Sequence, residues 1–137
     1  MEKFRKSFDV LWADLDPNFH VRHTAYNDYA AQVRFAFLSE NGYTLEKFRQ
    51  EGIGPVIFRE ETKFLKEVFA GDTLTVDMQV PFVSEDGRKW KIQHHVFRKD
   101  GECAAEITIE GAWFDLKNRK VTVPPQTLQQ AMAKLQE

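Results

Sequence analysis

The chain has 137 residues, 42% of them hydrophobic and 29% charged, which is typical of one globular domain with one core. We therefore expect a single domain over residues 1–137. A net charge of −2 gives no electrostatic basis for binding nucleic acid, and no apolar run approaches the roughly 18 to 20 residues of a membrane span.

The chain begins with charged residues that no long apolar run follows. This pattern does not indicate a secretory signal and favours a cytoplasmic location. The one cysteine, Cys103, excludes an internal disulfide and any cysteine-based metal cluster. It lies in a strand-like run, where a free thiol is typically a buried packing residue.

The first third of the chain predicts a strand, a loop and a long helix. Alternation from Phe8 to Trp12 predicts a strand that ends where the acidic segment 14–16 begins. From Thr24, which can act as an N-cap, apolar residues recur at helical spacing until Asn41-Gly42, a stop signal. We expect much of this helix to be buried, because apolar residues extend well beyond a narrow stripe: Ala25, Tyr26, Tyr29, Ala30, Val33, Phe35, Ala36, Phe37 and Leu38.

The middle of the chain changes from helical to strand periodicity. Residues 44–51 favour a short second helix. The run from Val56 to Phe69 is rich in strand-forming residues, and 74–82 alternates strongly. We expect Ala70-Gly71-Asp72 to turn the first of these runs back into the second.

Two Asp-Gly pairs divide the remaining strand-like residues. Asp86-Gly87 and Asp100-Gly101 are strong hairpin signals. The sequence thus predicts four consecutive strands in an antiparallel meander. A short strand near 121–123 closes the sheet, and apolar spacing from Leu128 to Leu135 predicts a final helix.

These elements give an α+β fold in which one sheet must cover one apolar helix. A curved sheet wrapped around the helix satisfies this requirement. Such a sheet leaves edge strands unpaired, and the pairing of one edge with its equivalent in a second copy would give a two-fold dimer.

Candidate chemistry lies between the first strand and the helix. This segment holds the carboxylates of Asp14 and Asp16 and the imidazoles of His20 and His23. Carboxylate and imidazole supply general bases, nucleophiles and orienting groups. The helix start beyond them offers unpaired N–H groups and a partial positive charge, so a polarised carbonyl group could bind there.

Each of these residues also has a purely structural interpretation. Asp16 precedes a proline and suits a turn or a cap, and Asp14 can cap the loop. His20 and His23 can donate hydrogen bonds to loop carbonyls. The four histidines of the chain lack the spacing of metal ligands, so the sequence predicts no metal site.

The segment from Trp12 to Val21, followed by a tyrosine-rich helix, resembles the hot-dog-fold acyl-CoA thioesterases, particularly those like 4-hydroxybenzoyl-CoA thioesterase. The resemblance covers nearly the whole chain. It implies a curved antiparallel sheet wrapped around a long central helix. The order of Asp16, Asn18 and His20 is also similar to that of the plant acyl-carrier-protein thioesterases.

The resemblance implies hydrolysis of an acyl-CoA thioester to a free acid and CoA, without a cofactor. Asp16 would act as nucleophile or as the general base that activates water, and His23 would orient Asp16 or the water. N–H groups at the helix start would polarise the carbonyl. The substrate-binding residues that the match implies around this loop are Asn18, His20, Thr24, Ala25 and Tyr26.

The family also implies where the CoA phosphates bind and how copies assemble. A basic cluster at the start of one strand binds the nucleotide phosphates in related enzymes, and Arg88 and Lys89 match it, with Arg59 a further candidate. In related dimers the pocket lies between subunits. This would bring the strand from Phe58 to Phe64 of one copy near Asp16 of the other, in a homodimer or homotetramer.

One departure from the family limits the resemblance. Arg22 and His23 stand where close relatives often carry two asparagines, so acyl specificity is not carried over. Two alternatives stay open: an acyl-thioester hydratase or dehydratase, whose motif is spaced differently, and a non-catalytic acyl-CoA-binding dimer. Thiol release that depends on Asp16 distinguishes a thioesterase from both.

Overall fold

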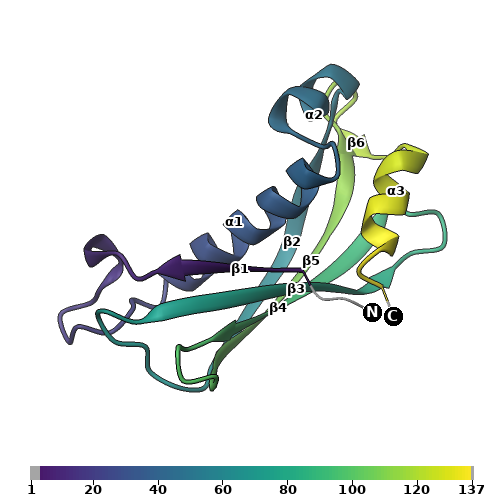
Figure 1. Cartoon of the computed structure of the whole chain (residues 1–137). Coiled ribbons are helices and arrows are strands. Elements are labelled where there is room, and N and C mark those ends of the chain that lie inside the picture. The colour runs from purple at the N-terminus through teal and green to yellow at the C-terminus, as the bar shows by residue number, and fades with distance from the viewer. Residues whose placement is uncertain (1–3, 137) are drawn as a thin grey trace.

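A computed structural model describes residues 4–136, in which a curved six-stranded antiparallel sheet wraps around one long helix (Figure 1). The strands follow the order β1-β3-β4-β5-β2, with β6 paired to β5. The strands are β1 (Phe4–Asp9), β2 (Ile53–Phe64), β3 (Thr73–Val83), β4 (Lys89–Phe97), β5 (Cys103–Asp115) and β6 (Lys120–Val121). The helices are α1 (Ala25–Glu40), α2 (Leu45–Glu51) and α3 (Gln126–Ala133).

The core lies between one face of α1 and the concave face of the sheet. Val33 of α1 is fully buried, as are Val76 of β3 and Ile107 of β5. Burial of each such side chain contributes roughly 1.5–3 kcal/mol. The opposite face of α1 is open, because Phe35 is 47% exposed. Burial of α1 is therefore one-sided, and Phe35 does not belong to the core.

The predicted first strand is wrong in its position. β1 ends at Asp9, and Trp12 begins a short 3₁₀ turn in which its side chain is 82% exposed. The alternation at 8–12 placed the strand too late, because the residues that pair with β3 begin at Phe4.

The predicted hairpin between Val56–Phe69 and the 74–82 strand is also wrong. β2 pairs with β5 at one edge of the sheet, whereas β3 pairs with β1 and β4. Alternation identifies a strand but not its partner, since every strand with one buried face has the same period. The crossing of the chain from β2 to β3 leaves the 12-residue β2 as an edge strand.

The other predicted elements are confirmed. β3, β4 and β5 form consecutive hairpins, and Gly87 and Gly101 have positive φ angles of 81° and 88° at the two turns. Thr44 caps α2 by accepting a hydrogen bond from the Lys47 amide at 3.2 Å. Within residues 4–136, no helix has the length and apolar character needed to cross a bilayer.

Candidate active site

The acidic segment forms a tight loop between β1 and α1. Leu15 and Val21 pair as an isolated bridge, and the Asp16 amide donates to the His20 carbonyl at 2.7 Å. The Phe19 amide donates to the Asp16 carbonyl at 3.0 Å, and Phe19 has a positive φ of 64°. Few non-glycine residues adopt this conformation, so the loop holds one strained residue beside Asp16.

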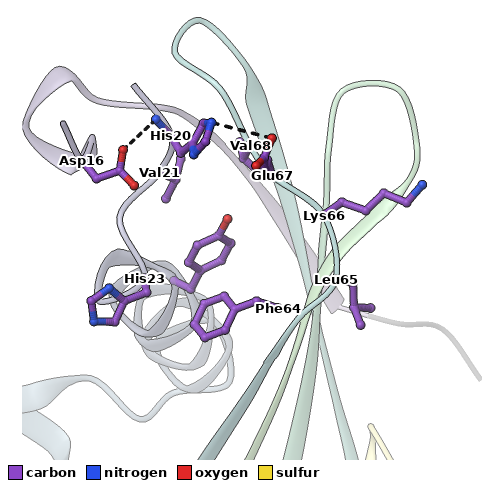
Figure 2. A pocket seen from close by; sticks show the side chains of 10 residues that line it. Asp16, His20, Val21, His23, Phe64, Leu65, Lys66, Glu67 and Val68 are labelled. Atoms are coloured by element: carbon purple, nitrogen blue, oxygen red, sulfur yellow. Dashed lines mark hydrogen bonds and ion pairs between the residues drawn. The ribbon is translucent and has the colours of Figure 1, made fainter. Parts of the chain in front are cut away.

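The Asp16 carboxylate is fixed through one of its two oxygens. Oδ1 accepts a hydrogen bond from the Asn18 amide at 2.8 Å and a second from the His20 amide at 3.1 Å, which Figure 2 shows as a dashed line. Within residues 4–136, Oδ2 accepts no hydrogen bond. One oxygen therefore anchors the side chain in the loop while the other is available to a substrate or a water molecule.

The start of α1 lies beside this carboxylate and has no side-chain cap. The Thr24 hydroxyl, predicted to act as the cap, instead accepts a hydrogen bond from Arg22 Nε at 2.9 Å. Ala25 is the first residue of α1 and is fully buried. First-turn amides that lack a cap carry the positive end of the helix dipole, which favours a negatively charged oxygen.

A cavity of about 280 Å³ opens at this place. Asp16, His20, His23 and Tyr26 line it together with the connection from β2 to β3. Burial and the negative charge of Asp16 raise the pKa of Tyr26. The last residue of β2, Phe64, lines the cavity, and the connection contributes Leu65, Lys66, Glu67 and Val68 (Figure 2).

The two loop histidines have different surroundings. His20 Nε2 lies 3.7 Å from Glu67 Oε2, and its ring packs edge-on against Phe69 at 4.8 Å between centroids. His23 is exposed, and Figure 2 shows its ring directed away from the Asp16 carboxylate. Among residues 4–136 of the single chain, His23 makes no hydrogen bond to Asp16.

Glu67 is a residue of this cavity that the sequence interpretation did not include. The order of residues gave no sign of it, because Glu67 was expected to lie in a strand from Val56 to Phe69 that only Ala70-Gly71-Asp72 would turn back. In the structure, the Val21 amide donates to the Val68 carbonyl at 2.8 Å, and the Ala70 amide donates to the Phe19 carbonyl at 3.1 Å. These bonds hold the connection against the acidic loop.

Asp14 is occupied by structural contacts. Its Oδ2 accepts a hydrogen bond from the Tyr29 hydroxyl at 2.6 Å, and its Oδ1 lies 3.2 Å from Arg22 Nη1. Burial and this hydrogen bond raise the pKa of Tyr29 to about 12. Asp14 and Arg22 therefore join the loop to the first turns of α1, and of the two carboxylates in the loop Asp16 is the one that lines the cavity.

The basic candidates lie elsewhere. Arg59 and Lys89 line a separate hollow of the sheet, where Arg59 pairs with Glu110 at 3.0 Å and with Glu61 at 3.1 Å. Arg88 lies in the β3–β4 hairpin, with its Nε 3.5 Å from Asp86 Oδ2. The single chain thus does not bring these three residues to the Asp16 cavity. In the described part of the chain, no three His, Cys, Asp or Glu side chains are arranged to hold a metal ion.

Comparison with known proteins decides the family. The model of the thioesterase-like superfamily matches residues 10–132, which include every element after β1 except the last residue of α3. The chain belongs to this superfamily. The resemblance to the hot-dog-fold thioesterases is thereby confirmed, together with the α+β hot-dog architecture.

Several solved structures share this fold at low sequence identity. A Staphylococcus aureus protein, solved in complex with CoA, is 19% identical, with a TM-score of 0.91 over 99% of this chain and 87% of the other. A 1,4-dihydroxy-2-naphthoyl-CoA thioesterase from Synechocystis is 18% identical, with a TM-score of 0.87 over 98% of both chains.

A gentisyl-coenzyme A thioesterase is also 18% identical, with a TM-score of 0.80 over 91% of this chain and 98% of the other. No curated protein sequence matches this thioesterase-like chain.

Proposed function

We propose that this protein hydrolyses acyl-CoA thioesters to a free acid and CoA, with Asp16 as the reacting carboxylate. The observation that carries the proposal is the geometry of Asp16: one carboxylate oxygen is anchored by two loop amides, and the other faces a cavity at the uncapped start of α1. Membership of the thioesterase-like superfamily supports the same reaction.

The chemistry requires a polarised carbonyl and an activated oxygen. First-turn amides of α1, including that of Tyr26, donate to the thioester oxygen as negative charge develops on it, an arrangement typically worth about 3 kcal/mol in the barrier. Asp16 either attacks the carbonyl carbon itself or removes a proton from the attacking water. Both routes consume one water and release the thiol and the acid, and neither needs a cofactor.

His20 and Asn18 support this reaction indirectly. Their amides hold Asp16 Oδ1, so their role in the proposal is to position the carboxylate and not to bond the acyl group. His23 is exposed at the rim of the cavity. We assign it to the orientation of water or of the thioester as the substrate enters.

We propose that CoA lies partly over the sheet, with Lys89, Arg88 and Arg59 near its phosphates. Guanidinium and ammonium groups are the usual partners of phosphate. Lys89 and Arg59 line a hollow that also contains Phe82, whose ring is 50% exposed and can pack against an adenine. The structure solved with CoA is of a protein with the same fold.

We further propose that two copies pair along β2. This edge strand presents unpaired backbone groups and exposed apolar side chains, with Ile57 45%, Phe58 60% and Phe64 53% exposed. Two-fold antiparallel pairing places the Phe64 end of one β2 beside the Ile57 end of the other. The Asp16 cavity of one copy, which Phe64 lines, then meets the partner's β2.

The test is a panel of short-chain, long-chain and aromatic acyl-CoAs, with free thiol and free acid measured together. Hydrolysis predicts that the two products form in equal amounts for at least one acyl class. Binding of acyl-CoA without release of either product would instead indicate a non-catalytic acyl-CoA-binding dimer and would overturn the proposal. A hydratase would change the acyl group without releasing thiol.

A further inference from the structure

A second cavity of about 220 Å³ lies between the C-terminal half of α1 and the sheet. In the described chain, none of its lining residues lines the Asp16 cavity. Its walls are largely aromatic and aliphatic, and they include Phe35, Phe48, Ile57, Trp90, Ile92 and Trp113. An apolar cavity of roughly 150 Å³ can hold a benzene ring, so this one has room for a ring with a small substituent.

Arg34 is the charged residue in the lining of this cavity. Its Nη1 lies 3.1 Å from His94 Nε2, and among residues 4–136 His94 is the one hydrogen-bond partner of its guanidinium. A guanidinium has five N–H donors, so most of those of Arg34 have no protein partner. Burial lowers the pKa of Arg34, and the negative charge of Glu60 acts against this shift without forming an ion pair within 4.0 Å.

His94 fixes the orientation of Arg34. The fully buried ring of His94 has its Nδ1 2.7 Å from the Asp77 carbonyl oxygen, which can only accept a hydrogen bond. Nδ1 is therefore the protonated nitrogen, and Nε2 is the acceptor that faces Arg34. Burial, with the nearby Arg34 charge, lowers the pKa of His94 to about 3 and keeps this ring neutral.

Trp90, which lines both this cavity and the Arg59 hollow, also carries a polar group without a partner in the described chain. The indole nitrogen of Trp90 is buried and makes no hydrogen bond to any described residue. Leaving a buried donor unpaired costs about 1–3 kcal/mol. A cavity that combines an apolar lining with one guanidinium that has free donors fits a ligand that carries acceptor oxygens on an apolar body.

We propose that this cavity receives the acyl group of the thioester, and that Arg34 binds a carboxylate at the far end of that group. The preferred substrate is thus a CoA thioester of a compact, preferably aromatic acid that bears a second, free carboxylate. A planar guanidinium pairs with a carboxylate through two parallel hydrogen bonds, a geometry that a hydroxyl or methyl group does not satisfy. Arg34 is then a specificity-determining residue, and His94 positions it.

This inference rests on the proposed function and on the pairing of two copies along β2. Ile57 lines the Arg34 cavity and Phe64 lines the Asp16 cavity, at positions roughly 20 Å apart along one strand. A compact acyl group does not span that distance within one chain. Antiparallel pairing of the β2 edges brings the Arg34 cavity of one copy beside the Asp16 cavity of the other.

The experiment compares 4-carboxybenzoyl-CoA with 4-methylbenzoyl-CoA, two thioesters of nearly equal shape. We expect the kcat/KM of the wild type to be about 30-fold or more higher for the carboxylated substrate. The methyl substrate leaves the charge of Arg34 unpaired when it covers the cavity, which weakens binding. Arg34→Met should remove this preference, so that the ratio of the two kcat/KM values falls to about one. Arg34→Lys, which keeps the charge but loses the planar pair of donors, should retain a reduced preference and a raised KM.

A binding measurement keeps this test separate from catalysis. The N-ethyl amides of 4-carboxybenzoic and 4-methylbenzoic acid resemble the two acyl groups and cannot be hydrolysed, and quenching of Trp90 and Trp113 fluorescence reports their binding. Binding that requires both the carboxylate and Arg34 supports the site even if no thioester is cleaved. An equal substrate preference in the wild type, Arg34→Lys and any folded Arg34→Met would overturn the inference while leaving thioester hydrolysis intact.

Discussion

Phe19 has an unusual backbone conformation for a phenylalanine. A positive φ costs an L-residue about 1–2 kcal/mol. The side chain is 60% exposed, so its burial offsets little of this strain. Replacement by glycine removes the strain but adds chain entropy to the unfolded state. We therefore predict that Phe19→Gly raises the free energy of unfolding by up to about 1 kcal/mol, as measured by urea denaturation.

The matched control is Phe82→Gly, at a residue of β3 that is 50% exposed. Glycine in a strand loses packing and gains no relief of strain, so this variant should be less stable than the wild type. Equal destabilisation of the two variants would show that Phe19 is not strained. Loss of thioester hydrolysis in a stabilised Phe19→Gly would show that the strain helps to present Asp16.

The proposed contact between Lys89 and the CoA phosphates can be tested by replacing this one side chain. Lys89→Ala should raise KM for an acyl-CoA about tenfold, because a charge-assisted hydrogen bond is lost. The corresponding acyl-pantetheine thioester lacks the nucleotide, so its KM should stay unchanged. Lys117→Ala removes an exposed lysine from the β5–β6 turn and serves as the control. A similar rise in KM for both thioesters would contradict the phosphate assignment.

The sequence identified the acidic loop but not which of its two aspartates is structural and which lines the cavity. Asp14 and Asp16 are two residues apart, and both have the chemistry of a general base. What separates them is tertiary contact: Tyr29 and Arg22 occupy Asp14, whereas backbone amides hold Asp16 at the cavity. Sequence spacing carries no information about these partners, so the assignment to Asp16 came from the family resemblance.

At the scale of elements, β2 is the part of the fold that local pattern predicted least well. Its strand character followed from composition, but its pairing with β5 depends on a crossing connection that no local signal marks. The Asp-Gly hairpins were predicted correctly because each turn has its own sequence chemistry. Glu67 was missed for the same reason as the β2 pairing, since both depend on the β2–β3 connection.

The exposed edge of β2 makes a direct prediction about assembly. Phe58→Lys places a charge on this edge, a change that blocks edge-to-edge pairing. We predict that the variant is monomeric by light scattering under conditions where the wild type is dimeric. Since the site is proposed to need both copies, its thioester hydrolysis should fall in parallel.

Val123→Lys provides the matched control, because Val123 is 44% exposed in the segment that leads to α3 and lies outside β2. This variant should keep the mass and the activity of the wild type. A wild type that is monomeric at all concentrations, yet active, would contradict the pairing along β2.

At the scale of the whole molecule, the buried His94 links folding to pH. Its pKa is about 3 in the folded chain and about 6.5 when unfolded, so the unfolded state binds more protons between these values. The contribution of His94 to stability is therefore fully present above pH 6.5 and is lost as pH falls toward 3. The slope is at most about 1.4 kcal/mol per pH unit.

The measurement is urea denaturation of the wild type and of His94→Gln between pH 7 and pH 4. Glutamine does not titrate, and its side-chain oxygen can accept the hydrogen bond from Arg34. The stability of the wild type should fall more steeply with acid than that of the variant. If stability fell equally with pH in the wild type and the variant, His94 would take up a proton as readily in the folded chain as in the unfolded one.

Asp16→Asn gives the most direct test of the central claim, that Asp16 is the reacting carboxylate of a thioesterase. The asparagine Oδ1 can still accept hydrogen bonds from the amides of Asn18 and His20, so the loop and the unfolding temperature should be preserved. Loss of the carboxylate should reduce kcat for release of free thiol by about 100-fold or more. A folded Asp16→Asn variant whose kcat equals that of the wild type would contradict the account.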